Sequence, residues 1–350
     1  MSNKTNTGNF FEDFKVGQVL THATPRTLTQ GDKALYQALF GSRFSLQSSD
    51  EVARAAGFPQ SPVDDLLAFH VVFGKTVPDV SLNAVANLGY ADCRFLKPVY
   101  PGDTLSTVSK VIGLKENSDG ATGVVYVRSI GRNQRDEIVL EYVRWVMVRK
   151  RDKASPAPVT DVPDLPKAVG AAFLEAPQGT NFAGFDVAAS GSAHLWDDYA
   201  VGERIDHVDG VTIEEAEHMM ATRLYQNTAK VHFNQFTEGQ GRFGRRLIYG
   251  GHVISLARSL SFNGLGNAQL IAAINGGRHV APCFAGDTIF AWSEVVDRAE
   301  VKNRRDIGAL RLRTIATKNL PCEVFPGAVD KGYADGVILD LDYWVLMPRR

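Results

Sequence analysis

The sequence predicts an α+β protein that contains two copies of one unit, each an antiparallel sheet wrapped around a central helix. A series of short motifs near the N-terminus recurs in the same order about 185 residues later. Each copy combines one long apolar helix with several strand-like stretches, and a buried helix followed by antiparallel strands requires a sheet that covers it. We therefore divide the 350 residues into a first copy at 1–151, a Pro-rich linker at 152–190 and a second copy at 191–350.

The repeat is carried by order and spacing rather than by identity. Residues 11–17 (FEDFKVG) reappear as residues 196–202 (WDDYAVG), and residues 102–104 (GDT) reappear as residues 286–288. Between the copies, five prolines lie within residues 152–178. Because proline can neither donate to a sheet ladder nor continue a helix, this stretch is expected to be a linker.

Each copy is expected to hold the same elements in the same order. A Thr-rich strand comes first, and a helix follows at 32–40 in one copy and at 214–225 in the other. The central helices begin near Asp64 and at Gly250, and both are apolar nearly all round, so we expect them to be buried. Because exposed sheet edges associate, the two sheets should join into one. Strands are expected at 107–114, 123–132, 138–148, 288–296, 309–316 and 337–347.

Composition excludes several classes of protein. The net charge of -1 provides no field that would attract nucleic acid or an anionic membrane, and no apolar run approaches the length needed to cross a bilayer. The three cysteines, Cys93, Cys283 and Cys322, are too few and too widely spaced for a disulfide scaffold or a zinc site. We expect a cytoplasmic protein with no metal, no nucleic acid partner and no membrane partner.

A motif in the second copy carries the candidate chemistry. Residues 225–232 (YQNTAKVH) precede residues 247–252 (LIYGGH), which lead into the central helix. The two segments resemble the signature of the MaoC-like hydratases, in which Gly-Asp-x-Asn-Pro-x-His is followed by an apolar-apolar-His-Gly turn. The segment 98–104 is similar to a second landmark of that family. The resemblance implies a double hotdog fold and an enzyme that adds water to, or removes it from, a coenzyme A thioester.

The resemblance also assigns roles to individual residues. It places His232 on the catalytic histidine and Asn227 on the catalytic aspartate. Gly250 falls on the glycine of the turn, while Tyr249 takes the place of the turn histidine, beside the substrate. Histidine titrates near neutral pH and can activate water. The amides of Gly250 and Gly251 would lie at a helix N-terminus, whose partial positive charge stabilises charge on a thioester oxygen.

The first copy lacks this chemistry. Ser42 occupies the aspartate position, Gln47 the histidine position and Asp65 the glycine position. Glutamine cannot exchange a proton at neutral pH, and a carboxylate would repel an enolate oxygen. One active site per chain is therefore expected, with the first copy shaping the tunnel for the substrate.

Asn227 departs from the family pattern, because an amide cannot act as a base. Two interpretations stay open. In the first, His232 does the proton work while Asn227 positions the water. In the second, a carboxylate elsewhere substitutes for the family aspartate, with Asp64, Asp65 and Glu238 as candidates.

The remaining histidines and the cations carry weaker signals. We expect His218, His252 and His279 to serve in packing or at the surface. Arg246 and Arg278 are candidates to bind the substrate, because the planar guanidinium suits both the phosphates of coenzyme A and a carboxylate. A solvated surface is the alternative for these two arginines.

Over nearly its whole length the chain also resembles the mesaconyl-CoA hydratases, most clearly in residues 61–70, 223–236 and 247–267. This resemblance implies reversible hydration of mesaconyl-CoA to β-methylmalyl-CoA in the ethylmalonyl-CoA pathway or a related carbon cycle. No cofactor is implied, since coenzyme A is part of the substrate. We also expect a homo-oligomer. Two alternative functions remain, a hotdog thioesterase and a non-catalytic acyl-CoA-binding protein.

Overall fold

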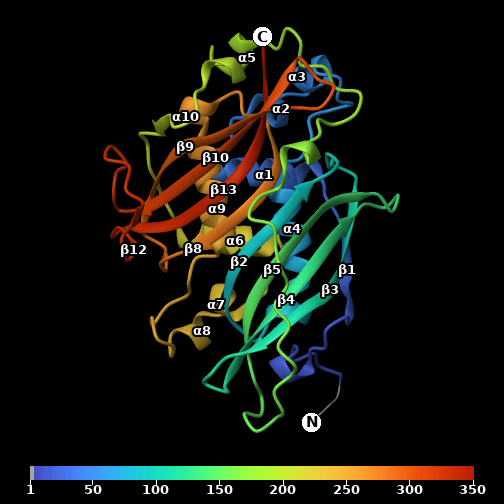
Figure 1. Ribbon diagram of the computed structural model, residues 1–350, viewed down its shortest axis with the longest axis vertical. Coiled ribbons are helices and arrows are strands. Elements are labelled where there is room, and N and C mark those ends of the chain that lie inside the picture. The colour runs from blue at the N-terminus through green and yellow to red at the C-terminus, as the bar shows by residue number, and fades with distance from the viewer. Residues whose placement is uncertain (1–3) are drawn as a thin grey trace.

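The computed structural model describes residues 4–350, which contain one continuous antiparallel sheet with helices packed on one side (Figure 1). The strand order is β1-β3-β4-β5-β2-β8-β13-β10-β9-β6, with β7 paired to β9. These strands are β1 (Val19–Thr27), β2 (Ala84–Phe95), β3 (Thr104–Glu116), β4 (Thr122–Arg132), β5 (Ile138–Arg149), β6 (Arg204–Asp206), β7 (Val211–Thr212), β8 (Leu270–His279), β9 (Thr288–Glu300), β10 (Ile307–Lys318) and β13 (Val337–Pro348). A separate small ladder pairs β11 (Ala328–Val329) with β12 (Gly332–Tyr333).

The two halves of the sheet meet where β2 of the first copy pairs with β8 of the second, with Tyr90 opposite Gly277. The two strands lie side by side in the middle of the molecule (Figure 1). The predicted joining of the two sheets is therefore confirmed. Because the strand edges at the junction are paired with each other, neither is left open to other chains.

A buried helix lies under each half of the sheet: α4 (Asp65–Thr76) in the first copy and α9 (Gly250–Leu260) in the second. Asp64 caps α4 by accepting a hydrogen bond from the amide of Leu66. The helices meet where His70 Nε2 and Ser255 Oγ lie 2.9 Å apart. These two residues are equivalent positions of the repeat, so the contact lies close to the two-fold axis that relates the copies.

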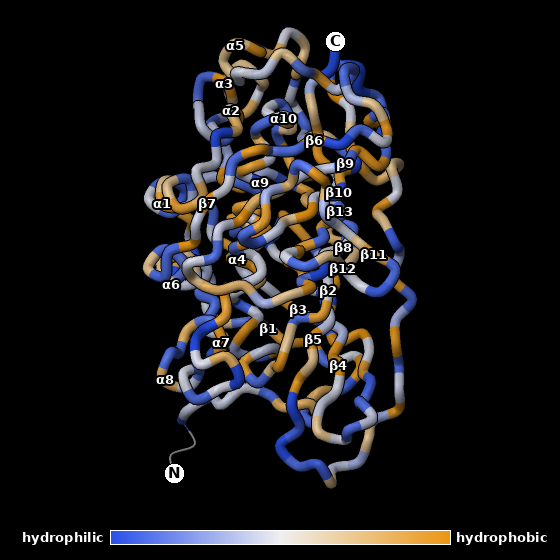
Figure 2. The backbone as a smooth tube through the Cα atoms, turned by 90° about the vertical axis from the view of Figure 1, so that its left-hand side faces the viewer, coloured by the Kyte–Doolittle hydropathy of each residue, from blue (hydrophilic) through white to orange (hydrophobic). Residues whose placement is uncertain are grey.

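The remaining helices cover the open side and the ends of the molecule. Figure 2 shows α1 and α6 on the side opposite the long strands β8, β10 and β13, with the central helices between them. The α-helices are α1 (Gln30–Phe40), α2 (Ser45–Ser48), α3 (Asp50–Ala55), α5 (Val187–Ser190), α6 (Glu215–Leu224), α7 (Lys230–Phe233), α8 (Gln235–Glu238) and α10 (Phe262–Leu265). Short 3-10 helices occur at Phe11–Asp13, Ala171–Phe173 and Trp196–Asp198, and a π-helix at Val77–Ser81 follows α4.

The architecture confirms the predicted α+β fold, in which a sheet wraps around one central helix in each copy. Most of the segment 152–190 is exposed, but its second half is packed against the sheet, since Val169, Leu174 and Phe182 are buried in one cluster with Leu270. No helix within residues 4–350 is long and apolar enough to cross a membrane.

Candidate active site

The site is built around the first residues of α9. The amide of Tyr249 donates to Nε2 of His218, at 2.9 Å. The next two amides, those of Gly250 and Gly251, donate to no acceptor in the described part of the chain. Both point along the helix axis at its positive end, so they form a pair of donors available to an anionic oxygen.

Large side chains pack directly on these two glycines. A Cβ atom on Gly250 would lie 2.4 Å from Cε1 of His279. A Cβ atom on Gly251 would lie 2.4 Å from the ring of Tyr249 and 2.5 Å from that of His70. Neither position can hold a side chain without displacing its neighbours, so glycine is required here by packing as well as for access to the backbone.

His232 lies in α7, beside this helix end. Its Nδ1 donates to the carbonyl of Leu247, at 2.9 Å, which leaves the lone pair of Nε2 free to accept a proton. Its ring centroid is 5.5 Å from that of Tyr249. Burial lowers the pKa of His232 to about 4, so the imidazole is neutral at physiological pH.

Asn227 is almost completely buried in the loop between α6 and α7. Its Oδ1 accepts a hydrogen bond from the amide of Ala229, at 3.2 Å. That bond fixes which end of the side-chain amide is the oxygen. The Nδ2 group makes no hydrogen bond within the described residues, so Asn227 offers a donor to a ligand or a water molecule.

Two histidines that the sequence assigned to packing or the surface lie within this site. The Nε2 atom of His279 is buried and has no hydrogen-bond partner in the part of the chain that the structure describes, and burial lowers the pKa of its ring to about 4. His218 caps the helix end, and its ring centroid is 6.2 Å from that of His232. The repeat could have pointed to His279. Its equivalent in the first copy is Phe95, so the histidine is present only in the copy that carries the candidate chemistry.

The first copy contributes His70 to the same cluster. The hydroxyl of Tyr249 lies 3.4 Å from Nδ1 of His70. Burial raises the pKa of Tyr249 well above its usual value and lowers that of His70 to about 3, so both side chains are uncharged. Burial lowers the pKa of the neighbouring His252 to about 3 as well. The helix end is thus surrounded by neutral aromatic and imidazole groups. In such a water-poor environment, the free amides of the helix interact strongly with a negative charge that develops on a substrate.

The two predicted substrate-binding arginines have different positions. Arg246 donates to Glu215 Oε1, at 2.5 Å, while its buried Nε has no partner among the described residues. It lies close enough to His218 to contribute to lowering the pKa of that ring. Arg246 therefore borders the site, although its charge is already paired.

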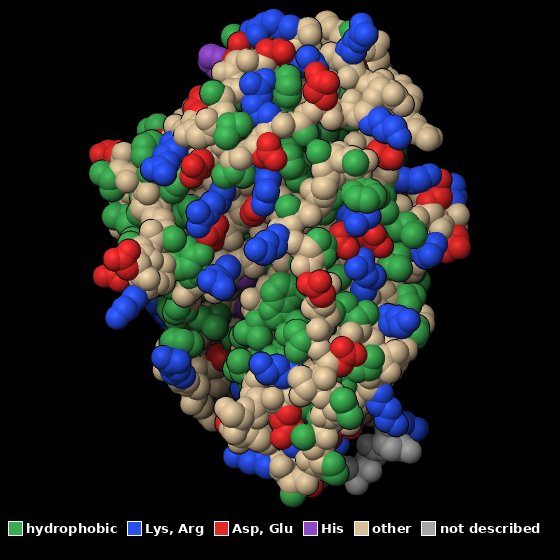
Figure 3. All heavy atoms as spheres, viewed as in Figure 1, with side chains coloured by type: hydrophobic (Ala, Val, Ile, Leu, Met, Phe, Trp, Pro, Cys, Tyr) green, Lys and Arg blue, Asp and Glu red, His purple; other side chains and the backbone are tan. Residues whose placement is uncertain are grey.

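The structure does not bring Arg278 to the site. In β8, His279 pairs with buried Leu339 and faces the central helices, whereas Arg278 pairs with Asp340 and is exposed. Successive side chains of a strand point to opposite faces, so Arg278 lies on the outer face of the sheet. Figure 3 shows that face, on which basic and acidic side chains are intermixed.

The candidate carboxylates Asp64, Asp65 and Glu238 make no hydrogen bond with His232 within the described residues. Asp64 caps α4, and Asp65 Oδ2 accepts from the amide of Ile271, at 2.8 Å. Both Asp64 and Asp65 lie beside Arg258, toward the far end of α9, and burial raises the pKa of Asp65 to about 7. Within residues 4–350, no Asp or Glu forms a hydrogen bond or ion pair with His232. The geometry favours the interpretation in which His232 carries the proton.

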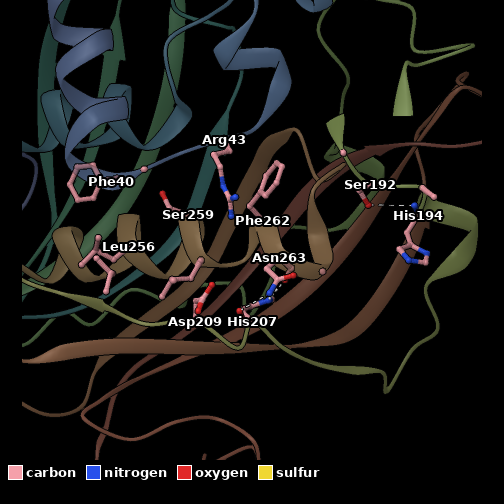
Figure 4. Close-up of a pocket in the computed structure, with 16 residues that line it drawn as sticks. Phe40, Arg43, Ser192, His194, His207, Asp209, Leu256, Ser259, Phe262 and Asn263 are labelled. Atoms are coloured by element: carbon pink, nitrogen blue, oxygen red, sulfur yellow. Dashed lines mark hydrogen bonds between the residues drawn. The ribbon is translucent and has the colours of Figure 1, made fainter. Parts of the chain in front are cut away.

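A cavity of about 740 Å³ lies elsewhere, toward the C-terminal end of α9. Figure 4 shows Phe40 and Arg43 from the first copy facing Ser259 and Phe262 from the second. Phe40 and Arg43 are the first-copy equivalents of Tyr225 and Thr228, which flank Asn227 in the second copy. The cavity contains neither the imidazole nor the glycine pair described above, so we do not place the catalytic centre there.

Comparisons with known proteins agree with this architecture. Residues 2–330 match the family profile described as mesaconyl-CoA hydratase. The chain is 66% identical over 351 residues to the β-methylmalyl-CoA dehydratase of Chloroflexus aurantiacus, with 100% of both chains covered. It is 62% identical over 346 residues to the mesaconyl-CoA hydratase of Cereibacter sphaeroides, with 99% of this chain and 100% of that one covered.

Solved structures support the fold. The crystal structure of a MaoC domain protein dehydratase from Chloroflexus aurantiacus matches with a TM-score of 0.97 and 65% identity over 100% of both chains. A conserved hypothetical protein from Mycobacterium tuberculosis, described as a double hotdog, matches with a TM-score of 0.80 and 26% identity over 98% of this chain and 99% of that one. The fold is therefore a double hotdog, and the chain belongs to the mesaconyl-CoA hydratase family.

Proposed function

We propose that this protein catalyses the reversible hydration of mesaconyl-CoA to β-methylmalyl-CoA. The observation that carries the proposal is the meeting of one free imidazole nitrogen, on His232, with two free amides, on Gly250 and Gly251, at one end of a buried helix. The relatives named for this reaction and its reverse are more than 60% identical over their full lengths, which supports the same chemistry here.

In the proposed reaction, the thioester oxygen accepts hydrogen bonds from Gly250 and Gly251. Water lies between Asn227 Nδ2, which donates to its oxygen, and His232 Nε2, which accepts one of its protons. As the water oxygen bonds to the β-carbon, the double-bond electrons move onto the thioester as an enolate, stabilised by the two amides. The imidazolium of His232 then returns the proton to the α-carbon, which restores the neutral histidine and the thioester.

This mechanism uses one group for both proton transfers, which is consistent with the lack of a carboxylate beside His232. The low pKa of His232 makes the imidazolium a strong acid, so the return of the proton to carbon is favoured. The acyl-CoA thioester is the partner, and the coenzyme is consumed and released with the substrate rather than held as a cofactor.

Two further expectations accompany this proposal. The continuous sheet ends at β1 and β6, and Val19 on β1 is 61% exposed, which favours association of chains into a homo-oligomer. Cys93, Cys283 and Cys322 are unpaired and buried, as is usual in the reducing environment of the cytoplasm.

The test is an assay of purified protein with mesaconyl-CoA, following the ultraviolet absorbance of the conjugated thioester and, in parallel, the release of free thiol. We expect the absorbance to fall without thiol release, and His232→Ala to lower the rate on the order of 10² to 10⁴-fold. His194→Ala, at an exposed histidine, is the matched control. Thiol release would instead support a thioesterase, and binding without either signal would support an acyl-CoA-binding protein.

A further inference from the structure

Arg144, on β5 of the first copy, is completely buried and has no acidic partner among residues 4–350. Its Nη2 donates to Thr76 Oγ1, at 2.7 Å, and to Ser81 Oγ, at 3.3 Å. Its Nε and Nη1 atoms, which carry three of the five N–H groups of the guanidinium, are buried and have no acceptor. The hydroxyl of Tyr142, from the same strand, is also buried. It lies close to Ser129 and Thr76 but makes no hydrogen bond of good geometry within residues 4–350.

An unpaired buried guanidinium is a costly feature. Removing a charge from water is strongly unfavourable unless partners replace the lost hydrogen bonds. Burial accordingly lowers the pKa of Arg144, and the groups that favour its charged form are the phenols of Tyr142, Tyr90 and Tyr249 rather than carboxylates. A fold gains no stability from such a group, so an acceptor from outside the protein is the natural complement.

The second copy shows that the fold does not require this charge. The match of Trp145 with Trp344 makes Tyr343 the equivalent of Arg144, and the Tyr343 hydroxyl lies 3.1 Å from Thr314 Oγ1. Arg258, the other buried arginine within residues 4–350, differs from Arg144 because Asp64 and Asp65 lie close enough to raise its pKa. Arg144 therefore stands out among the buried arginines by its lack of a counter-charge.

Arg144 is connected to the active site by adjacent aromatic rings. It lies directly opposite Tyr90 in the sheet, and the ring of Tyr90 is 6.0 Å from that of His279, which packs on Gly250. On the helix side, the guanidinium lies 4.2 Å from the ring centroid of Phe73, and that ring lies 5.7 Å from Tyr249.

Strand spacing places Arg144 within reach of a short acyl group. Across the junction, Tyr90 is paired with Gly277, which has no side chain. Arg144 and Gly277 are thus two strands apart, about 10 Å between backbones. The arginine side chain extends from β5 toward α4, as its contact with Phe73 shows, so its donors lie on the same side of the sheet as His279.

We propose that Arg144, assisted by the hydroxyl of Tyr142, binds the free carboxylate of the dicarboxylic acyl group, and so selects it over a monocarboxylic enoyl-CoA. This inference rests on the proposed function, because only a substrate with a second carboxylate supplies the missing acceptor. The carboxylate oxygens accept from Nε or Nη1 and from the phenol, while Thr76 and Ser81 hold the guanidinium in place. The two arginines considered from the sequence are less suited, since Arg246 is paired with Glu215 and Arg278 faces outward.

The test compares kcat/KM for mesaconyl-CoA and crotonyl-CoA, which lacks the second carboxylate, in the wild type, Arg144→Met, Arg144→Lys and Tyr142→Phe. We expect Arg144→Met to lower the ratio of the two values on the order of 100-fold or more. Arg144→Lys should lose less of the ratio because it keeps the charge, and Tyr142→Phe should lose about tenfold. Arg313→Gln, which removes an arginine paired with Asp340, is the control and should leave the ratio unchanged.

The wild type provides a readout that does not depend on a folded variant. If Arg144 binds a carboxylate, free mesaconate should raise the melting temperature of the wild type by more than free crotonate does. An unchanged ratio in a folded Arg144→Met variant, or equal effects of the two free acids, would overturn the inference. A wild type that is inactive on mesaconyl-CoA would overturn the proposed function instead, so the two failures are distinct.

Discussion

The imidazole of His279 packs against Gly250 so closely that a Cβ atom added to this glycine would lie only 2.4 Å from Cε1 of the ring. The contact fixes a strand of the sheet against the end of α9, at the point where the two backbone amides are free. It also explains why a residue with no side chain is needed at this position, independently of its backbone angles.

Gly250→Ala should therefore displace His279 and the helix end together. We expect kcat to fall about 10² to 10³-fold, the usual cost of losing one oxyanion donor. If the cause is the steric conflict, Gly250→Ala combined with His279→Ala should recover part of the loss, so that the two substitutions are not additive. Gly276→Ala, for which a Cβ would meet only Tyr90 O at 3.8 Å, is the matched control on β8. Fully additive losses would argue against the steric explanation.

The acid limb of the pH profile should reflect the partly buried imidazole of His232. Because burial lowers its pKa to about 4, the residue stays neutral and able to accept a proton well below pH 6.5. We expect kcat/KM for hydration to remain level from neutral pH down to about pH 5 and to fall as the pH approaches 4. Circular dichroism at each pH separates this limb from unfolding. An acid limb centred near 6.5 would show that the imidazole is solvated in the working enzyme.

Asn227→Asp would restore the residue type that the MaoC-like signature has at this position. We nevertheless expect a loss of roughly tenfold in kcat/KM, because the free Nδ2 donor is replaced by an acceptor while Oδ1 remains bound to Ala229. The added negative charge should also raise the pKa of His232 and move the acid limb upward. Asn227→Ala, which lacks both groups, serves as the comparison. Activity above that of the wild type would show that a carboxylate base is useful here after all.

The stability of the protein should decrease as the pH falls below neutral. Burial lowers the pKa of His252 to about 3, so the folded state keeps it neutral while the unfolded chain binds a proton below about pH 6.5. Its contribution to stability is thus complete above pH 6.5 and is lost progressively as the pH falls toward 3. Removing the group should flatten the slope of unfolding free energy between pH 6.5 and 5 by up to about 1.4 kcal/mol per pH unit.

Two replacements of His252 provide the measurement and its control. His252→Leu introduces the residue found at the equivalent position of the first copy, Leu67, and His252→Gln keeps a polar side chain. The two variants should differ in stability at pH 7, because they pack differently, but should share the flatter slope in chemical denaturation. If the slope matched that of the wild type in both variants, another group would be responsible for the acid sensitivity.

Much of the fold could be predicted from local pattern. The central helices begin at Asp65 and Gly250, close to where the apolar pattern predicted them, since that pattern is a local property of the sequence. His232 and the turn that leads into Gly250 belong to one copy, and the ring of His232 lies 5.5 Å from that of Tyr249, the residue before Gly250. These features depend on residues that are close in the chain or repeated at a fixed distance.

The rest of the site depends on long-range pairing. Arg278 and His279 are consecutive, and the sequence favoured the arginine for binding, but the strand turns the histidine toward α9 and the arginine away. Only the register of β8 decides between them, because a shift of one residue exchanges the two faces. Arg144 was missed because its neighbours, Tyr90 and Phe73, come from different elements, and an arginine in a strand is ordinarily a surface residue.

The junction between β2 and β8 makes a single polypeptide of what would otherwise be an assembly of two identical subunits. In such a symmetrical pair, every residue near the axis occurs twice. A second buried guanidinium would destabilise the fold, because no ligand would replace the hydrogen bonds that it loses with water. Covalent fusion removes that constraint, because Arg144 can appear in one half while Tyr343 occupies the matching place in the other. The two halves are thereby free to specialise: the second copy holds the groups that make and break bonds, and the first copy binds the distal carboxylate of the substrate.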